Sequence, residues 1–217
     1  MTIGKLGFSG NLNIRHLRND KEVTKIDQWK RKLYLNGIGY KLRNKTRPAF
    51  LKGWFNQMLL RQVSLVTHQA IFLPQLSAMV IKENGDRIDL GVISYRSVTT
   101  AFCEFMVDQL IAETAVFGDF KWHDGGVGVT AENITDTDIE TTDGEARVSG
   151  TQVESTSVIY ESVGTIPYTT TKAITEHGLF NASTGVTLLD RSQFAAINVV
   201  NGDSIQFTYD LTCTAGG

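Results

Sequence analysis

The sequence predicts a mainly β protein, a β-sandwich of jelly-roll-like type with an extended basic N-terminal arm and two short helices. From residue 120 onward, short Thr-, Val- and Ile-rich stretches alternate with Asp-Gly, Asn-Gly and Gly-rich turns. Turns spaced by about eight to twelve residues are typical of sandwiches and barrels. Residues 1–62 hold 14 Lys and Arg against 3 Asp and Glu, whereas residues 63–217 hold 7 against 20. The chain therefore divides into a basic segment with a helix, 1–62, and an acidic β domain, 63–217.

The overall composition restricts the classes of protein that the chain can belong to. Its 217 residues, 41% of them hydrophobic, suffice for one core plus an arm. No stretch approaches the roughly 18 apolar residues of a membrane helix, and the N-terminus lacks the apolar region of a secretory signal. Cys103 and Cys213 are expected to be free, buried thiols of a protein made in a reducing cytoplasm, with a disulfide between them as the alternative. Without a CxxC pair, a cysteine zinc site is not expected.

The first 47 residues indicate an arm followed by short elements. Residues 1–13 are rich in Gly and Asn and suit an extended arm that becomes ordered on a partner. Residues 17–36 predict one or two helical turns that end near Gly37. In residues 38–47 the alternation of Tyr40 and Leu42 with Lys41 and Arg43 predicts a short strand.

Two segments have the spacing of helices. The first covers residues 48–61, with Thr46 as candidate N-cap and Pro48 in the first turn. Its apolar residues share one face: Phe50, Leu51, Trp54, Phe55, Met58 and Leu59. The second covers residues 99–113, with Thr99 or Thr100 as the cap. Its expected buried stripe consists of Phe102, Phe105, Met106, Gln109 and Leu110.

Strand signals surround the second helix. Residues 81–90 predict a hairpin with Asn84-Gly85 as a two-residue turn of type I′. Residues 91–98 continue as a strand. Residues 204–211 alternate most regularly, with Ile205, Phe207, Tyr209 and Leu211 on one face. Pro167 is expected on an edge strand or at a bulge.

Several residue groups could suggest chemistry, but their patterns favour structural roles. His123-Asp124 could form a base and its orienting carboxylate, yet neighbours in a strand point to opposite faces. The Gly-Gly-Val-Gly run at 125–128 is no dinucleotide fingerprint because no helix follows it, and a flexible turn is expected.

Metal sites are not expected either. The histidines are dispersed, so buried histidines with backbone partners are favoured, and a histidine ring around an oligomer axis is the alternative. These histidines are His16, His68, His123 and His177, the last beside Glu176. The acidic residues of 136–145 lack the spacing of a calcium loop and predict a solvated loop. The sequence therefore predicts no catalytic residue, no cofactor and no metal.

The basic segment offers the strongest candidate for a site. Its cations are interleaved with aromatic side chains, a combination that can bind an acidic protein surface or a phosphate backbone. Protein is favoured as the partner, since the acidic body would repel nucleic acid. The predicted partner-binding residues are Arg15, Arg18, Trp29, Lys30, Arg31, Lys32, Tyr40, Arg43, Lys45 and Arg47.

Residues 88–217 resemble the β modules of tailed-phage virion proteins, of the marine or cyanophage kind. The resemblance rests on residues 120–137 and 145–152, on Val-Gly-Thr-Ile at 163–166 and on Phe-Ala-Ala-Ile-Asn-Val-Val-Asn-Gly-Asp at 194–203. The string Ala-Ile-Thr-Glu-His-Gly-Leu-Phe at 173–180 is also similar to a strand of tail-fibre N-terminal modules. The basic N-terminal third matches neither group.

The resemblance implies a sandwich that is built into the virion in several copies. We expect a capsid decoration (cement) protein, not an enzyme, that stabilises the assembled head through its basic arm. Its expected partners are the major capsid protein and itself, as a homotrimer on the capsid surface, with neither nucleic acid nor membrane involved. A head- or tail-fibre adaptor or receptor-binding module is the alternative, and a virion hydrolase ranks last.

Overall fold

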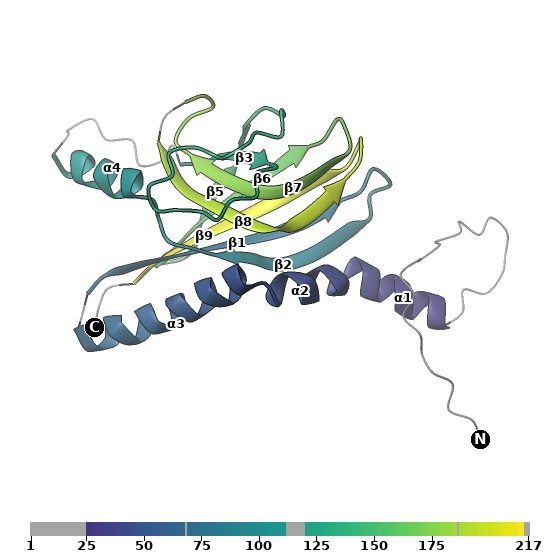
Figure 1. Cartoon of the computed structure of the whole chain (residues 1–217), viewed down its shortest axis with the longest axis horizontal. Helices are drawn as coiled ribbons and strands as arrows, with labels where there is room; N and C mark the ends of the chain where they lie inside the picture. Colours follow the sequence, from purple (N-terminus) through teal and green to yellow (C-terminus); the bar gives the residue numbers. More distant parts are fainter. Residues whose placement is uncertain (1–24, 68, 112–119, 186, 215–217) are drawn as a thin grey trace, which may run out of the picture.

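The fold is a two-layer β structure with helices along one side. The computed structural model describes residues 25–67, 69–111, 120–185 and 187–214. Within these residues, nine strands form two antiparallel sheets (Figure 1). Strands hold 43% of the chain and helices 27%, so the prediction of a mainly β protein is confirmed. The expected extended arm, residues 1–13, lies outside the described residues.

The two sheets have unequal widths. The five-stranded sheet has the order β2-β1-β9-β6-β5 and the four-stranded sheet the order β4-β3-β7-β8. The strands are β1 (Ile71–Ile81), β2 (Arg87–Tyr95), β3 (Trp122–Gly126), β4 (Val148–Ser149), β5 (Thr151–Thr156), β6 (Ile159–Pro167), β7 (Lys172–Phe180), β8 (Leu188–Val199) and β9 (Ser204–Thr214). The helices are α1 (Lys25–Leu35), α2 (Ile38–Lys45), α3 (Pro48–Thr67) and α4 (Thr100–Ile111).

The core lies between the inner faces of the two sheets. On β9 the residues Ile205, Phe207, Tyr209 and Leu211 are all buried, so the predicted alternation is confirmed. The Phe207 ring reaches the opposite sheet, with its centroid 6.1 Å from that of Phe194 on β8. Strand β9 pairs with β1 on one side and β6 on the other, which makes it the centre of the five-stranded sheet.

The predicted hairpin is confirmed, but its turn differs. β1 and β2 pair in antiparallel fashion around residues 82–86. The Gly85 N–H donates to the Lys82 carbonyl, and Gly85 has a positive φ, of 82°. This is the pattern of a three-residue loop with a bulged glycine, instead of the two-residue type I′ turn. Pro167 is the last residue of β6, beyond the pairing with β5, as expected for an edge position.

Both predicted helices are present. Helix α3 begins at Pro48, as predicted, and extends to Thr67. Thr46 caps the C-terminus of α2 instead of the N-terminus of α3, and its hydroxyl donates back to the Leu42 and Arg43 carbonyls. Thr99 caps α4, accepting the Phe102 N–H at 3.1 Å. Phe102 is buried, but Leu110 is 85% exposed, so the buried stripe was predicted one turn too long.

The predicted strand at residues 38–47 is wrong, because residues 38–45 form helix α2. The alternation of Tyr40 and Leu42 does not describe the burial, since Leu42 is exposed. Tyr40 and Asn44 are four residues apart, so a helix places both on the side that faces the sheets. Gly37 separates α1 from α2 at a φ of 59°, and a Cβ there would lie 2.4 Å from the Asp89 carbonyl oxygen.

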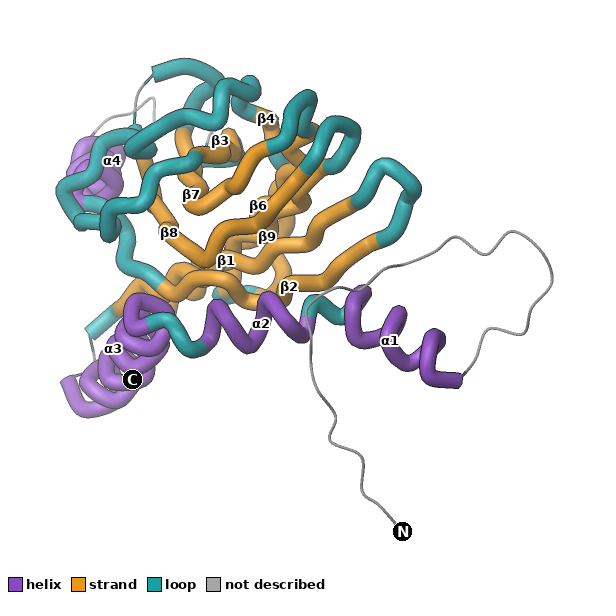
Figure 2. Tube along the Cα trace, turned by 45° about the vertical axis from the view of Figure 1, so that its right-hand side comes forward, coloured by secondary structure: helices purple, strands orange, loops and turns teal. Residues whose placement is uncertain are grey.

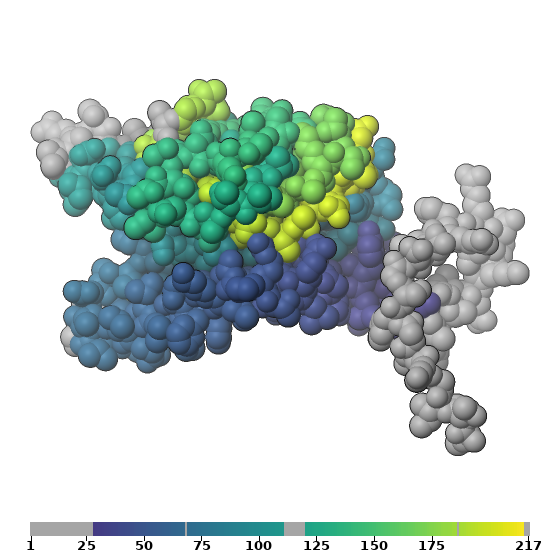
Figure 3. Space-filling model, viewed as in Figure 1, coloured from purple at the N-terminus to yellow at the C-terminus, as the bar shows by residue number. Residues whose placement is uncertain are grey.

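Helices α1, α2 and α3 follow one another along one side of the sandwich (Figures 1 and 2). The space-filling view shows them as a layer beneath the strands (Figure 3). Helix α2 contacts both β2 and β8, which are edge strands of different sheets. The helix therefore covers an edge that would otherwise leave backbone groups unpaired. None of the helices in the described residues is long and apolar enough to span a membrane.

Asn44 joins the two edge strands. Its side chain is 1% exposed. The amide nitrogen donates to the Ile93 carbonyl on β2 at 2.8 Å, and the amide oxygen accepts the Ala195 N–H on β8 at 3.1 Å. One side chain thus satisfies a buried acceptor on one sheet and a buried donor on the other.

The cysteines were predicted to be buried, and this is wrong. Both Cys103 and Cys213 are free, as expected, but both are exposed. Cys103 lies on the outer side of α4, and Cys213 near the end of β9. The sequence around the two cysteines therefore did not predict that both side chains are exposed.

We expect Asn44→Ala to destabilise the fold by about 1–3 kcal/mol, because it leaves two buried backbone groups without partners. The measurement is the free energy of unfolding in urea. Lys45→Ala, at the adjacent exposed position, is the matched control and should leave the midpoint nearly unchanged. Equal midpoints for the two variants would contradict the bridging role of Asn44.

Candidate functional site

The predicted partner-binding residues lie on α1, on α2 and in the link to α3. Arg15 and Arg18 lie outside the described residues. Helix α1 carries Trp29, Lys30, Arg31 and Lys32, helix α2 carries Tyr40, Arg43 and Lys45, and Arg47 follows α2. The structure divides this set into residues that bind the chain's own sheets and residues that remain exposed.

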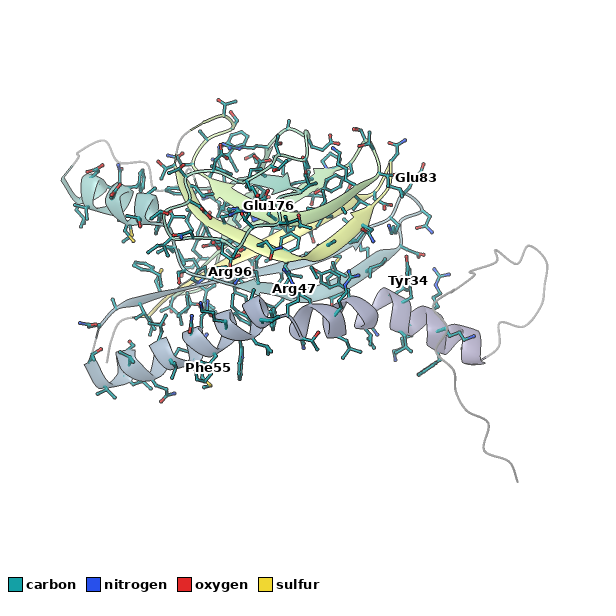
Figure 4. All side chains as sticks on the ribbon, in the orientation of Figure 1. Tyr34, Arg47, Phe55, Glu83, Arg96 and Glu176 are labelled. Carbon is teal, nitrogen blue, oxygen red and sulfur yellow. The ribbon has the colours of Figure 1, made fainter. Side chains whose placement is uncertain are left out.

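Four of the predicted residues make contacts within the chain: Arg31, Tyr40, Arg43 and Arg47. The Tyr40 hydroxyl donates to the Ala195 carbonyl at 2.8 Å, and burial raises the tyrosine pKa above its ordinary value. Arg43 donates to the Ala196 carbonyl at 2.7 Å, and Arg47 donates to the Gln193 side chain. Figure 4 shows Arg47 directed toward the sandwich.

Two cations of the helices form ion pairs with acidic residues of the same chain. Arg31 pairs with Asp86 at 2.8 Å, and Lys41 pairs with Asp89 at 2.7 Å. Both acids belong to the β1–β2 hairpin region. The acidic body is therefore itself a partner of the basic segment, a role that the charge asymmetry alone could not assign.

Four predicted residues are exposed, and their side chains make no hydrogen bond or ion pair within the described part of the chain. We name them together the basic surface: Trp29, Lys30, Lys32 and Lys45. Trp29 is 57% exposed, although a tryptophan is costly to leave in water. Among the described residues, none of the three lysines has an ion-pair partner. A solvated cation beside an exposed aromatic ring can contact an acidic partner at little desolvation cost.

Helix α3 shows a feature that the sequence did not reveal. The apolar face was predicted correctly, but only Phe50 of its six residues is buried. The side toward the sheets carries Gly53, Gln57 and Ser64, and the bulky residues point away. Figure 4 shows Phe55 on the side of α3 away from the sheets. Helical periodicity identifies a face, but it does not state which side contacts the body.

His123 and His177 are buried between the sheets, as expected for structural histidines. His123 Nδ1 lies 2.9 Å from His177 Nε2, and His123 Nε2 lies 2.9 Å from the Ser162 hydroxyl. The partners are therefore side chains and not the expected backbone groups. Burial lowers the pKa of His123 to about 3 and that of His177 well below its ordinary value, so both rings are neutral at pH 7.

The surroundings of His123 leave no room for a substrate. A Cβ at Gly164 would lie 2.4 Å from His123 Cδ2, and one at Gly150 would lie 2.7 Å from Nε2. Asp124 points to the other face of β3, as the alternation predicts, and its carboxylate pairs with Arg147 at 2.8 Å. His123 and Asp124 do not form a base and orienter pair.

The outer face of the four-stranded sheet carries a buried ion pair. Glu176, fully buried on β7, accepts Arg191 Nε at 2.7 Å. It also accepts the N–H groups of Gly128, Glu140 and Thr141, so a single carboxylate fixes both ends of the loop over residues 128–141. A carboxylate with this many donors forms strong, charge-assisted bonds.

The turn predicted at residues 125–128 is wrong in part, because Gly125 and Gly126 belong to β3 and Gly128 is buried. The solvated loop predicted at residues 136–145 agrees with the burial, since most of its residues are exposed. A Cβ at Gly126 or Gly128 would lie within 2.5 Å of Glu176 Oε1, so the glycines admit the carboxylate. Glu140 and Asp136 both pair with Arg191, at 3.3 and 2.9 Å. In the described part of the chain, no group of three or more His, Cys, Asp or Glu could hold a metal ion.

Asp190 is the most perturbed acid of the core. Burial raises its pKa to about 7, opposed by nearby Arg96 and reinforced by Glu132. Its hydrogen bond from the Ser192 hydroxyl is long, at 3.4 Å. Arg96, the cation that opposes this shift, pairs with Glu132 at 2.5 Å.

Comparisons with known proteins do not identify a family. A scan against protein-family models, a search of curated proteins and a search of solved structures return no significant match. The fold and the exposed surfaces are therefore the basis for a functional proposal.

We expect Asp190→Asn to gain stability relative to the wild type as the pH rises from about 4 to about 7. The folded-state pKa of Asp190 is raised, so the wild-type fold binds a proton there that the unfolded chain has already released. Wild-type stability is therefore lost across this interval, whereas the amide has no proton to lose. The measurement is the free energy of unfolding at several pH values.

The matched control is Asp108→Asn, an exposed position on α4. Only the pH dependence that exceeds that of this control is assigned to Asp190. A difference for Asp190→Asn that stays flat or falls with pH would contradict the assignment.

Proposed function

We propose that this protein is a virion structural protein of a tailed phage, a decoration (cement) protein that binds the assembled capsid. Its partners would be the major capsid protein and further copies of itself, on the capsid surface. The proposal rests on the resemblance of residues 88–217 to virion β modules and on the exposed surfaces of the helices. Binding requires burial and charge complementarity only, and no turnover.

The basic surface is the observation that supports this proposal most directly. Lys30, Lys32 and Lys45 remain exposed after the neighbouring cations have paired with the chain's own acids. Trp29 supplies a large aromatic side chain of the kind that is enriched at interfaces. An acidic area of a capsid subunit is the complementary partner.

The helical layer changes the expected mode of binding. Because α1 and α2 contact β2 and β8, the basic surface is formed before the partner arrives. A preformed surface avoids the ordering cost that a free arm would incur on binding. The mechanism proposed for α1 and α2 is therefore the docking of a rigid surface.

A head- or tail-fibre adaptor or receptor-binding module is the second candidate. The string at 173–180 that is similar to tail-fibre modules forms most of β7, and six of its eight residues are buried. Buried residues determine a shared sandwich and not a shared receptor site. The similarity therefore supports a common β module without favouring the fibre role over the shell role.

Two measurements test the proposal. The first is binding of the purified protein to capsids that lack it, with capsid stability compared before and after addition. The second is copy number per virion by quantitative mass spectrometry against the major capsid protein. Hundreds of copies and added stability support a cement protein. A handful of copies, or no binding, would reject it in favour of a vertex, neck or fibre position.

We expect the triple variant Lys30→Glu, Lys32→Glu, Lys45→Glu to weaken capsid binding by about tenfold or more, because it places like charges against an acidic surface. Arg87→Glu, at an exposed position on β2, is the control and should bind nearly as the wild type does. The measurement is a binding isotherm on purified capsids. Unchanged affinity of the triple variant would place the capsid contact elsewhere.

A further inference from the structure

We infer that the outward face of α3 is a self-association surface that binds the same face of a second copy of this chain. We name this surface the α3 face and define it by its exposed apolar residues. They are Leu51, Trp54, Phe55, Met58, Leu59, Leu65 and Val66. The inference rests on the proposed function and deepens it, because it names the surface through which copies of the chain would bind one another.

The orientation of α3 is set by the side that faces the sheets. Gln57, which is buried, donates to the Pro74 carbonyl at 2.5 Å and to the Arg96 carbonyl at 3.2 Å. A Cβ at Gly53 would lie 2.2 Å from the Tyr95 carbonyl oxygen, so the helix backbone lies directly against β2. Rotation of the α3 face inward would break these bonds and drive bulky side chains into the strand.

The exposed apolar area of the α3 face is larger than the apolar patches that monomers usually expose. Its seven side chains are between 40% and 79% exposed. With about 200 Å² for a fully exposed large side chain, they present about 730 Å² to water. The largest apolar patch of a typical monomer is about 300–600 Å². A stable complex buries about 800 Å² on each partner, so the area of the α3 face is close to that of a contact with one partner.

The spacing of the α3 face favours another helix as its occupant. Leu51, Phe55, Met58, Gln62 and Leu65 follow one another at alternating intervals of four and three residues. This is the seam of a coiled coil, in which each side chain fits between those of a facing helix. A lipid surface imposes no such spacing.

The charges of α3 favour a copy of the same helix. The helix contains no acidic residue, and its only charged residues are Lys52 and Arg61, neither of which belongs to the seam. The seam itself carries no charge, so two seams can meet without burying a charge, while Lys52 and Arg61 flank the contact at its exposed margins. Gln62, the polar seam position, can both donate to and accept from its own copy, because an amide has both groups. A polar seam residue of this kind sets register and copy number.

Analytical ultracentrifugation of the full chain without capsids tests the inference. We expect the wild type to sediment as a dimer or trimer and Phe55→Glu, Met58→Glu to sediment as a monomer. The matched control is Val107→Glu, Leu110→Glu, with the same spacing on exposed positions of α4, and it should keep the wild-type mass. Circular dichroism verifies that each variant retains its fold.

Disulfide cross-linking provides a second measurement that does not depend on the double variant. In a Cys103→Ser, Cys213→Ser background, Gln62→Cys should form a covalent dimer on mild oxidation. Asn56→Cys, exposed on the same helix outside the seam, should remain monomeric. A cross-link at both positions or at neither would overturn the assignment of the seam.

The other possible occupants have distinct outcomes. A monomeric wild type overturns the inference, whether the α3 face then binds capsids or vesicles of anionic lipid. An oligomer that Phe55→Glu, Met58→Glu leaves intact also overturns it. An oligomer that fails to bind capsids would reject the proposed function alone, since self-association is measured without capsids.

Discussion

The contact between α2 and the two edge strands is the constraint on which the rest of the structure depends. A two-layer sandwich has open edges, and β2 and β8 form one of them. Asn44 satisfies a carbonyl on β2 and an N–H on β8, while Tyr40 and Arg43 bind two further carbonyls of β8. The same contact determines where α1 and α3 emerge. The basic surface and the α3 face are therefore consequences of edge protection.

The polar residues that could suggest catalysis are used to build the interior. His123 and His177 bind each other and Ser162 between the sheets, and Glu176 with Arg191 fixes the loop over the outer face. A buried ion pair of this kind is weak evidence for stability but effective at specifying one arrangement of a long loop. The chemistry of these side chains therefore serves the scaffold, and the helices supply the exposed surfaces.

Much of the fold followed from local patterns. The alternation at residues 204–211, the hairpin at 81–90 and the helices beginning near Pro48 and Thr99 are all present, because period and turn chemistry are local properties. Residues 38–45 were misread because four alternating residues fit a strand as well as a helix. The feature that distinguishes the helix is the four-residue spacing of Tyr40 and Asn44. This spacing can be interpreted only when it is known that both side chains contact β8. The basic residues were likewise found, but not which of them would bind Asp86, Ala196 or Gln193.

The sequence by itself determined a mainly β chain with a basic first third, an acidic remainder and one strongly apolar helix. These are properties of amino-acid composition and of the spacing of apolar residues, and each can be determined from one segment without the rest of the chain. Only the tertiary structure decided that the basic helices close the sandwich, that Glu176 is a buried anchor, and that α3 presents its apolar side outward. The physical reason is that burial depends on what lies opposite a side chain. For α3 the deciding residues are Gly53 and Gln57. Gly53 lies in close contact with β2 and Gln57 donates hydrogen bonds to the sheet, so the bulky residues point away from the strands.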